Sequence, residues 1–256
     1  MHLPLESVRE MPGIQRSLAL YAAHLDNDAL REWSWAIRGL DDRSLLAAAA
    51  IAAEASVTDR AIFTAERTLQ LHDYAQRYPL PHREALDAAT RQWDLDEAFV
   101  YGLIRQESRF LPQARSPAGA VGLMQIMPRT AKWIARQIPV QPYHSDMLAR
   151  PDVNVLMGSY YLHRVLEALG HPILATAAYN AGPARARRWR DTKPLEGAIY
   201  AETIPFPETR EYVKKVFTNA WFYRNRLSGA TASLRQSLGT VPGADESSDS
   251  VAANIP

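Results

Sequence analysis

Apolar residues recur every three or four positions along the first 85 residues, which is the spacing of one face of a helix. The spacing is clearest over Ile14, Leu18, Tyr21 and Leu25. Similar runs predict helices at 13–25, 27–40, 45–55 and from Thr58 onward. Because the connectors between these runs are short, we expect successive helices to pack as a right-angled or superhelical α-stack.

A break in this pattern predicts a domain boundary. The segment Tyr78-Pro79-Leu80-Pro81 places two prolines within three residues, which favours an extended link. Strand-like alternation is nearly absent from the chain, and helical spacing resumes at 82–92, 95–109, 128–138, 152–169, 172–180 and 208–226. We therefore expect an all-α protein, with an α-helical stack over residues 1–81 and a second, larger domain over residues 82–228.

The last part of the chain has a different composition. No aromatic residue follows Ser228, and Ser, Gly, Ala and acidic residues dominate the segment. Such a segment has too little apolar surface to offset the entropy lost on ordering. The composition therefore predicts that residues 229–256 form a disordered tail.

The overall composition excludes several classes of function. The 256 residues include 29 Lys and Arg against 28 Asp and Glu, a net charge of +1, so a nucleic-acid-coating protein is not expected. The absence of cysteine excludes a thiol nucleophile, disulfides, thiolate zinc sites and iron–sulfur clusters. None of the 7 histidines stands in an HExxH spacing, and no phosphate-binding glycine motif is present. We expect no metal and no cofactor.

No segment of the sequence has the length of a membrane span. The longest apolar run, Leu45 to Ala53, is mostly alanine, whereas a spanning helix needs about 20 apolar residues. The first residues, MHLPLESVREMPG, lack the basic and apolar stretches of a signal peptide. The sequence therefore indicates either a cytosolic protein or a chain that lacks the start of its precursor.

The second helix of the second domain carries a carboxylate in an unusual position. Asp94 and Glu97 have the spacing of a capping box, which predicts a helix start there. The apolar stripe of this helix includes Leu103 and Ile104, and its continuation by one turn reaches Glu107. The pattern therefore places Glu107 on the buried face of the last turn.

Burial of Glu107 would disfavour its charged form and raise its pKa, so the carboxyl would stay protonated near neutral pH and act as a general acid. The alternative is a surface ion pair with Arg105 or Arg109, two positions before or after it. Spacing alone leaves both interpretations open.

Longer motifs around Glu107 resemble one known family. The run ESRFLPQARSPAGAVGLMQIMPRTA resembles the signature of the soluble lytic transglycosylases, lysozyme-like enzymes of bacterial cell walls. AAYNAGPARARRW, ETIPFPETREYV and the helix PDVNVLMGSYYLHRVL resemble further blocks of this family. The match covers about residues 85–226, and residues 1–81 resemble the part that adjoins the catalytic domain in the large soluble members. The resemblance implies a lysozyme-like fold.

The resemblance also implies an activity. Family members cleave the β-1,4 bond between N-acetylmuramic acid and N-acetylglucosamine without water and leave a 1,6-anhydro end. Glu107 is implied as the catalytic residue, acting first as acid and then as base, with the substrate acetamido group stabilising the positive anomeric carbon. The implied partner is the peptidoglycan glycan strand, and the implied setting is the periplasm. We expect a monomer that needs no metal and binds no nucleic acid.

The family pattern implies the remaining site residues position by position. A substrate-binding role is implied for Ser116, Met124, Gln125, Met127, Tyr179, Asn180 and Glu202. Five of these positions also have a structural interpretation: Ser116 as a turn residue, Met124 and Met127 as core, Tyr179 as a buried tyrosine, Glu202 as an exposed loop residue.

Two other functions remain open at this stage. A muramidase on the same fold would admit water to the anomeric carbon, and Asp146 and Asp152 are the only additional acids expected near the middle of the domain. A wall-binding module of an envelope assembly system would cleave only incidentally. The basic run Arg185, Arg187, Arg188 and Arg190 indicates a solvated helix face, or a surface that meets the carboxylates of wall peptides.

Overall fold

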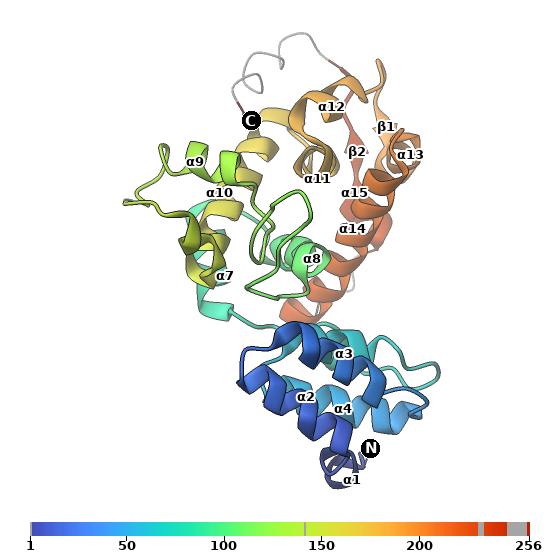
Figure 1. The fold of residues 1–256 in the computed structure, drawn as a ribbon. Helices are drawn as coiled ribbons and strands as arrows, with labels where there is room; N and C mark the ends of the chain where they lie inside the picture. Colours follow the sequence, from blue (N-terminus) through green and yellow to red (C-terminus); the bar gives the residue numbers. More distant parts are fainter. Residues whose placement is uncertain (1, 141, 230–232, 245–254) are drawn as a thin grey trace. The chain divides into compact units, whose positions relative to one another are not determined.

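The computed structural model describes residues 2–140, 142–229, 233–244 and 255–256. The chain forms two compact units, Met1–Pro81 and His82–Pro256, which are drawn in Figure 1. The division falls directly after the double-proline segment that ends at Pro81. Helices dominate both units, which confirms the expected all-α class.

The first unit consists of short helices that pack largely in sequence order. They are α1 (Leu5–Arg9), α2 (Pro12–Ala22), α3 (Asp26–Ala36), α4 (Asp42–Glu54), α5 (Thr58–Ala65) and α6 (Tyr74–Arg77). The closest pairs are α2 with α3 and α4 with α5. Their apolar faces form one core around Ile14, Trp33, Ile37 and Ile51, each almost fully buried. This core stabilises helices that are too short to persist alone in water.

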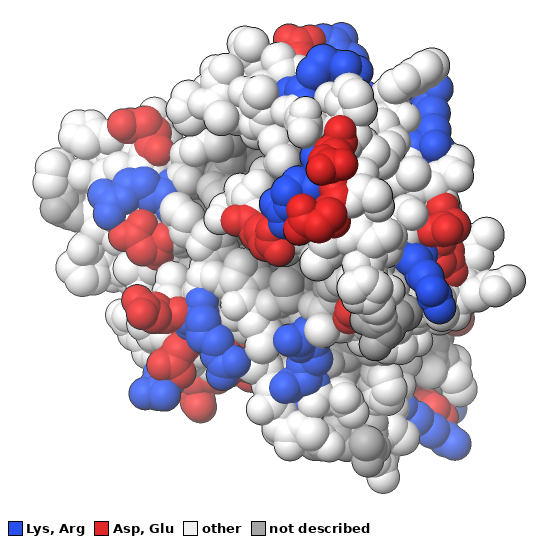
Figure 2. Space-filling view, turned by 90° about the horizontal axis from the view of Figure 1, so that it is seen from below, with Lys and Arg blue, Asp and Glu red and all other residues white. Residues whose placement is uncertain are grey.

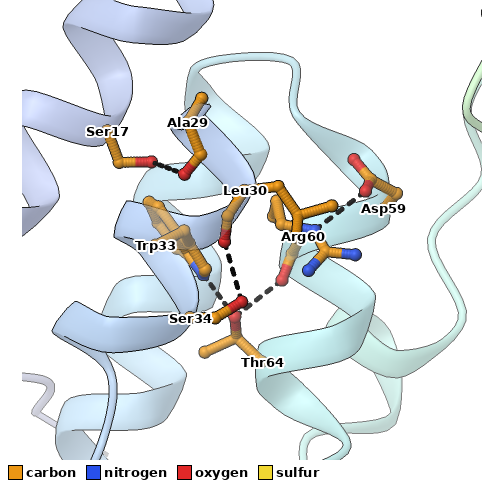
Figure 3. A network of polar contacts seen from close by, with 8 residues as sticks. All are labelled: Ser17, Ala29, Leu30, Trp33, Ser34, Asp59, Arg60 and Thr64. Atoms are coloured by element: carbon orange, nitrogen blue, oxygen red, sulfur yellow. Dashed lines mark hydrogen bonds and ion pairs between the residues drawn. The ribbon is translucent and has the colours of Figure 1, made fainter. Parts of the chain in front are cut away.

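Buried polar groups inside this unit are paired with one another (Figure 3). The indole nitrogen of Trp33 on α3 donates to Thr64 Oγ1 on α5 at 2.9 Å. The Thr64 hydroxyl donates in turn to the carbonyl of Arg60 at 2.7 Å. Ser17 on α2 donates to the carbonyl of Ala29 on α3 at 2.7 Å. These bonds tie three helices together at fixed positions.

The second unit begins with α7 (Arg83–Gln92) and α8 (Glu97–Ser108). It continues with α9 (Pro128–Ile134), the 3-10 helix η1 (Ser145–Ala149), α10 (Pro151–Leu169), α11 (Pro172–Ala181) and α12 (Pro183–Arg188). The strand β1 (Leu195–Glu196), α13 (Gly197–Thr203), α14 (Pro207–Ser228), α15 (Leu234–Leu238) and the strand β2 (Thr240–Val241) complete it. The helix ranges expected from the sequence do not include α12, although its basic run indicated a solvated helix face.

The most extensive helix contact of this unit joins α8 to α14 (Figure 1, green and orange). A Cβ atom at Gly102 on α8 would lie 2.7 Å from the backbone nitrogen of Ala220 and 2.8 Å from the carbonyl oxygen of Val216. Only glycine permits this approach, because real Cβ contacts are not that short. The buried side chain of Arg105 donates to Asn219 Oδ1 at 3.0 Å across the same contact.

The start of α8 differs from the sequence expectation. The side chain of Asp96 accepts a hydrogen bond from the backbone N–H of Phe99 at 2.8 Å, so Asp96 is the N-cap. Asp94 adopts a left-handed backbone with φ of 49° and does not cap the helix. The capping-box prediction therefore placed the N-cap two positions too early, although the helix itself was predicted correctly.

The predicted disorder of residues 229–256 also needs correction. Residues 230–232 and 245–254 lie outside the described residues, but 233–244 contain α15 and β2. In the antiparallel pair of strands, Val241 lies opposite Leu195 and Thr240 opposite Glu196. Val241 is buried, and Arg224 donates to Ser237 at 3.0 Å. Backbone pairing and one apolar side chain order this segment, and composition does not reveal either.

Candidate active site

The carboxyl group of Glu107 lies at the end of the central helix of the second unit. Glu107 is the penultimate residue of α8, and the chain turns away at Arg109, which adopts a left-handed backbone at the helix C-cap. The side chain is half-buried. Arg105 points instead to Asn219. The sequence pattern therefore located the buried face of the helix correctly.

Burial raises the pKa of Glu107 from its ordinary value of 4.5 to about 7, while the hydroxyl of Tyr212 acts in the opposite direction. Tyr212 donates a short hydrogen bond to Oε1 of Glu107, which stabilises the charged form. Among the described residues, no second carboxylate contributes to this pKa. Glu107 is thus a lone acid that is poised to exchange a proton near neutral pH.

Tyr212 lies in the motif ETIPFPETREYV, but the sequence alone indicated no role for it. Tyr212 is buried on α14, the helix that packs on α8. Burial and the charge of Glu107 raise its pKa well above the ordinary value for tyrosine, so it remains a donor. Helical spacing from Tyr212 to Val216 and Asn219, all buried, is the signal that places its side chain on the face toward α8.

Tyr179 lies close enough to Glu107 to sense its charge, but its hydroxyl has another partner. The carboxylate raises the pKa of Tyr179, as does burial, which is the larger cause. The Tyr179 hydroxyl donates to the backbone carbonyl of Met124 at 2.8 Å. The edge of its ring meets the ring of Tyr161 on α10, with centroids 5.4 Å apart. The hydroxyl that contacts the acid therefore belongs to Tyr212.

A cavity of about 370 Å³ opens beside Tyr179. Four of the predicted site residues line it together: Gln125, Met127, Tyr179 and Asn180. Residues that the sequence did not single out complete the wall, namely Ile126, Arg129, Thr130, Tyr161, Ala178, Gly182 and Pro256. An apolar wall with a few convergent polar groups is typical of a ligand site.

The loop before α9 is held in place by one buried asparagine. Asn154 on α10 accepts from the backbone N–H of Met124 at 2.7 Å. Its amide donates to the carbonyls of Val121 at 3.0 Å and Leu148 at 2.7 Å. A Cβ atom at Gly122, where φ is +83°, would lie 2.2 Å from the Asn154 amide nitrogen. Glycine is therefore required where the loop crosses this side chain.

Two of the implied binding residues serve the loop instead of lining the cavity. The side chain of Met124 is fully buried, packs against Gly158 and is absent from the cavity wall, so a contact between Met124 and substrate stays a prediction. The Ser116 hydroxyl accepts from the backbone N–H of Ala120 at 3.0 Å, and Ser116 is absent from the cavity wall. Both residues match their structural interpretations. Each shapes the backbone that carries Gln125.

The remaining two predicted residues differ in their relation to the cavity. Asn180 lines the cavity and accepts from the Thr209 hydroxyl at 2.7 Å, which joins α11 to α14. Glu202 on α13 is exposed, lies 3.2 Å from Lys214 Nζ, and is not part of the cavity wall. A contact between Glu202 and substrate stays a prediction.

Within the described ranges, no group of three or more His, Cys, Asp or Glu side chains could hold a metal ion. Figure 2 shows acidic and basic side chains interspersed on the face that it draws. In the basic run, Arg185 donates to the Ala181 carbonyl at 2.9 Å and lies over the ring of Phe206.

No helix in the described part of the chain has the length and apolar character to cross a membrane.

Glu107 is a lone acid at the end of α8 whose charge reaches the cavity residue Tyr179, and this arrangement in an all-α unit fits a lysozyme-like domain. Three family profiles match the chain: "Soluble lytic murein transglycosylase L domain" over residues 7–74, "Transglycosylase SLT domain" over 84–199, and "Soluble lytic transglycosylase helical domain" over 203–231. The chain belongs to the soluble lytic transglycosylase family.

Named relatives and solved structures agree with this assignment. The soluble lytic murein transglycosylase of Salmonella typhimurium is 33% identical over 233 residues, which are 88% of this chain and 36% of the relative. Lytic transglycosylase Slt of Pseudomonas aeruginosa superposes with a TM-score of 0.83 at 34% identity, over 92% of this chain and 39% of that one. The 70 kDa enzyme of Escherichia coli superposes with a TM-score of 0.78 at 29% identity, over 87% of this chain and 37% of that one. The chain thus spans a little over a third of the length of these relatives.

Proposed function

We propose that this protein is a peptidoglycan lytic transglycosylase, which cleaves the β-1,4 bond between N-acetylmuramic acid and N-acetylglucosamine. The observation that carries the proposal is the environment of Glu107. Its lone carboxyl has a pKa of about 7, accepts a hydrogen bond from Tyr212 and lies close to the cavity residue Tyr179. A carboxyl with this pKa is largely protonated at neutral pH or just below and can protonate a departing sugar oxygen.

In the proposed reaction, Glu107 donates its proton to the glycosidic oxygen as the bond to the anomeric carbon breaks. The substrate acetamido oxygen stabilises the positive charge on that carbon. The Glu107 carboxylate then removes the proton from the 6-hydroxyl of the muramic acid, and that oxygen bonds to the anomeric carbon. The product is a 1,6-anhydro end, and the acid returns to its starting state. One carboxyl group serves twice, in place of the acid and second carboxylate of most glycosidases.

The surrounding residues fit supporting roles in this reaction. Tyr212 positions the carboxyl through its hydrogen bond, and both tyrosines keep their protons because their pKa values are raised. Tyr179 presents a ring against which a sugar can pack. Gln125 and Met127, which line the same cavity, would also contact the sugar.

The relatives support the proposal in two ways. Those of Salmonella typhimurium and Escherichia coli are named soluble lytic murein transglycosylases. The Pseudomonas aeruginosa structure is that of an inactive mutant, in which a glutamate is replaced by glutamine. By analogy, a single carboxyl group of this chain would be indispensable. We also propose a periplasmic location and a monomeric enzyme, in line with the family.

The muramidase alternative needs a group that activates water, and neither additional acid is suited to this. Asp152 is exposed, and Arg150 at 2.8 Å helps to lower its pKa. Asp146 is exposed in η1. Neither residue lines the cavity or shifts the pKa of Glu107.

Digestion of purified sacculi tests the proposed function. The chain should release soluble fragments, and Glu107→Gln should release almost none while keeping the same circular dichroism spectrum. Loss of a general acid–base group lowers the rate by about 10²–10⁴-fold. Normal digestion by the folded Gln variant would contradict the role of Glu107, and absence of digestion by the unaltered chain would contradict the function.

A further inference from the structure

Residues 255–256 lie against the cavity wall. The hydroxyl of Tyr161 on α10 donates to the backbone carbonyl of Pro256 at 3.0 Å. Pro256 is one of the residues that line the 370 Å³ cavity. The preceding Ile255 is only 8% exposed, whereas Pro256 is exposed. Ile255 therefore anchors the segment in the second unit, next to the proposed site.

The position of the contact connects it directly to the site. The ring of Tyr161 meets that of Tyr179 edge to face at 5.4 Å, and both rings line the cavity. Tyr161 itself is only 8% exposed. A buried phenol hydroxyl needs an acceptor, and here the backbone oxygen of Pro256 fills that need. The segment thus occupies the hydroxyl of Tyr161, a residue that lines the same cavity as Gln125 and Asn180.

The Pro256 oxygen is an acceptor for the Tyr161 hydroxyl, and a glycan can offer an acceptor oxygen in its place. The N-acetyl groups of peptidoglycan sugars carry an amide carbonyl, and a proline ring next to a tyrosine fills space much as a sugar ring does. When the segment leaves, the Tyr161 hydroxyl would be exposed to the cavity without this acceptor. An acceptor on a bound sugar would then restore its hydrogen bond.

We propose that Tyr161 binds an N-acetylated sugar of the glycan, and that residues 255–256 occupy this position until the glycan displaces them. The proposal rests on the proposed function for the identity of the glycan. The segment acts as a competitor within the same chain. If it occupies the position nine-tenths of the time, the apparent affinity for the glycan falls about tenfold, because only the open fraction binds.

Binding of chitotetraose, a β-1,4 chain of N-acetylglucosamine, measures this competition. The measurement uses calorimetry on the Glu107→Gln protein, so that no turnover interferes. Removal of residues 255–256 should lower the dissociation constant about three- to tenfold. Ile255→Asp, which places a charge at a buried position, should release the segment and produce the same gain at full length.

A matched control separates this effect from a general effect of added charge. Leu234 is partly exposed in the first turn of α15, where an acid is well tolerated. Leu234→Asp should therefore leave the dissociation constant unchanged. An unchanged or weaker affinity after removal of residues 255–256 would overturn the proposal, because the segment would then be a supporting wall of the site.

A double-mutant comparison tests the role assigned to Tyr161. In the chain without residues 255–256, Tyr161→Phe should weaken chitotetraose binding several-fold, because the sugar loses its donor. In the full chain the same change should have a smaller effect, because it loosens the competing segment as well. Equal effects in both backgrounds would show that the hydroxyl does not alternate between the two partners.

Direct displacement can be followed through the methyl signal of Ile255. In protein labelled at isoleucine methyl groups, saturation with chitotetraose should move the Ile255 signal toward the position of an exposed isoleucine. A signal that stays in place at saturation would overturn the proposal. Digestion of sacculi is measured separately. If chitotetraose displaces residues 255–256 but the protein releases no fragments from sacculi, the proposed function is contradicted and the competition is still supported.

Discussion

The hydroxyl of Tyr212 donates a hydrogen bond to the carboxyl of Glu107, although 105 positions separate the two residues. The contact depends on the close packing of α8 on α14, which Gly102 permits by bringing the two backbones together. The burial that raises the pKa of Glu107 and the bond that lowers it are thus set by the same pair of helices. This relationship leads to the first prediction.

Tyr212→Phe should raise the pKa of Glu107 further, because the hydrogen bond that stabilises the carboxylate is lost. A bond to a charged group is worth about 1.5–3 kcal/mol, so the shift should be about one pH unit or more. The alkaline limb of the pH profile of kcat/KM should move upward by that amount, while kcat falls. Tyr223→Phe, on the same helix but stacked on Tyr101, is the control and should leave the limb in place. An unmoved limb in the Tyr212 variant would contradict a positioning role.

The raised pKa of Glu107 also predicts a dependence of stability on pH. A carboxyl whose folded pKa is about 7 and whose ordinary value is 4.5 favours folding in its protonated form. Its contribution is complete below pH 4.5 and is lost as the pH rises through 7. Glu107→Gln cannot ionise, so it should be more stable than the unaltered protein at pH 8, by about 1–3 kcal/mol.

Chemical denaturation at pH 4 and pH 8 measures this difference. The two proteins should have similar free energies of unfolding at pH 4 and should diverge at pH 8, with the Gln variant the more stable. A difference that is the same at both pH values would show that Glu107 does not titrate with a raised pKa.

Asn154→Ala should destabilise the second unit through the loop that carries Gln125. The change leaves the buried N–H of Met124 and the carbonyl of Leu148 without this partner, while the carbonyl of Val121 keeps its bond from the backbone N–H of Ile126. Each unpaired group costs about 1–3 kcal/mol, so the total loss should be about 2–6 kcal/mol. Thermal unfolding measures it, with Asn225→Ala at an exposed position of α14 as the control. A loss no larger than that of the control would contradict the role of Asn154.

Thr64→Val should loosen the first unit, because it keeps the shape of the side chain but removes the acceptor of the Trp33 indole. The expected cost is about 1–3 kcal/mol. Amide hydrogen exchange should accelerate in residues 1–81. The alkaline limb of the pH profile of kcat/KM should stay where it is. Ser34→Ala, which removes a bond within α3 alone, should have a much smaller effect. Equal effects of the two changes would show that the Trp33 bond does not stabilise the unit.

Local periodicity predicted most of the helices, because each one buries an apolar stripe that is legible in the sequence. It also predicted the burial of Glu107, since a single carboxylate continues the stripe of α8. The N-cap of that helix was missed because Asp94 and Asp96 are both suitable capping residues, and only the backbone conformation decides between them.

The details of the site depend on contacts that the sequence does not display. Met124 and Met127 stand three positions apart in one motif, yet one is fully buried and the other is 41% exposed. The half-buried Tyr179 and the buried Tyr212 both lie near the acid, and the fold alone determines which hydroxyl reaches it. The contact of Pro256 with Tyr161 joins distant positions and has no local signal at all.

The mass of the fragments released from purified sacculi tests the central claim most directly. The 6-hydroxyl must compete with water at about 55 M, and well-aligned intramolecular groups reach effective molarities of about 10⁵ M or more. We therefore predict that the main products end in 1,6-anhydro-muramic acid and are lighter than hydrolysis products by one water. Fragments that carry a reducible muramic acid end would show that water attacks the anomeric carbon, and would contradict the transglycosylase mechanism even if Glu107 remains the acid.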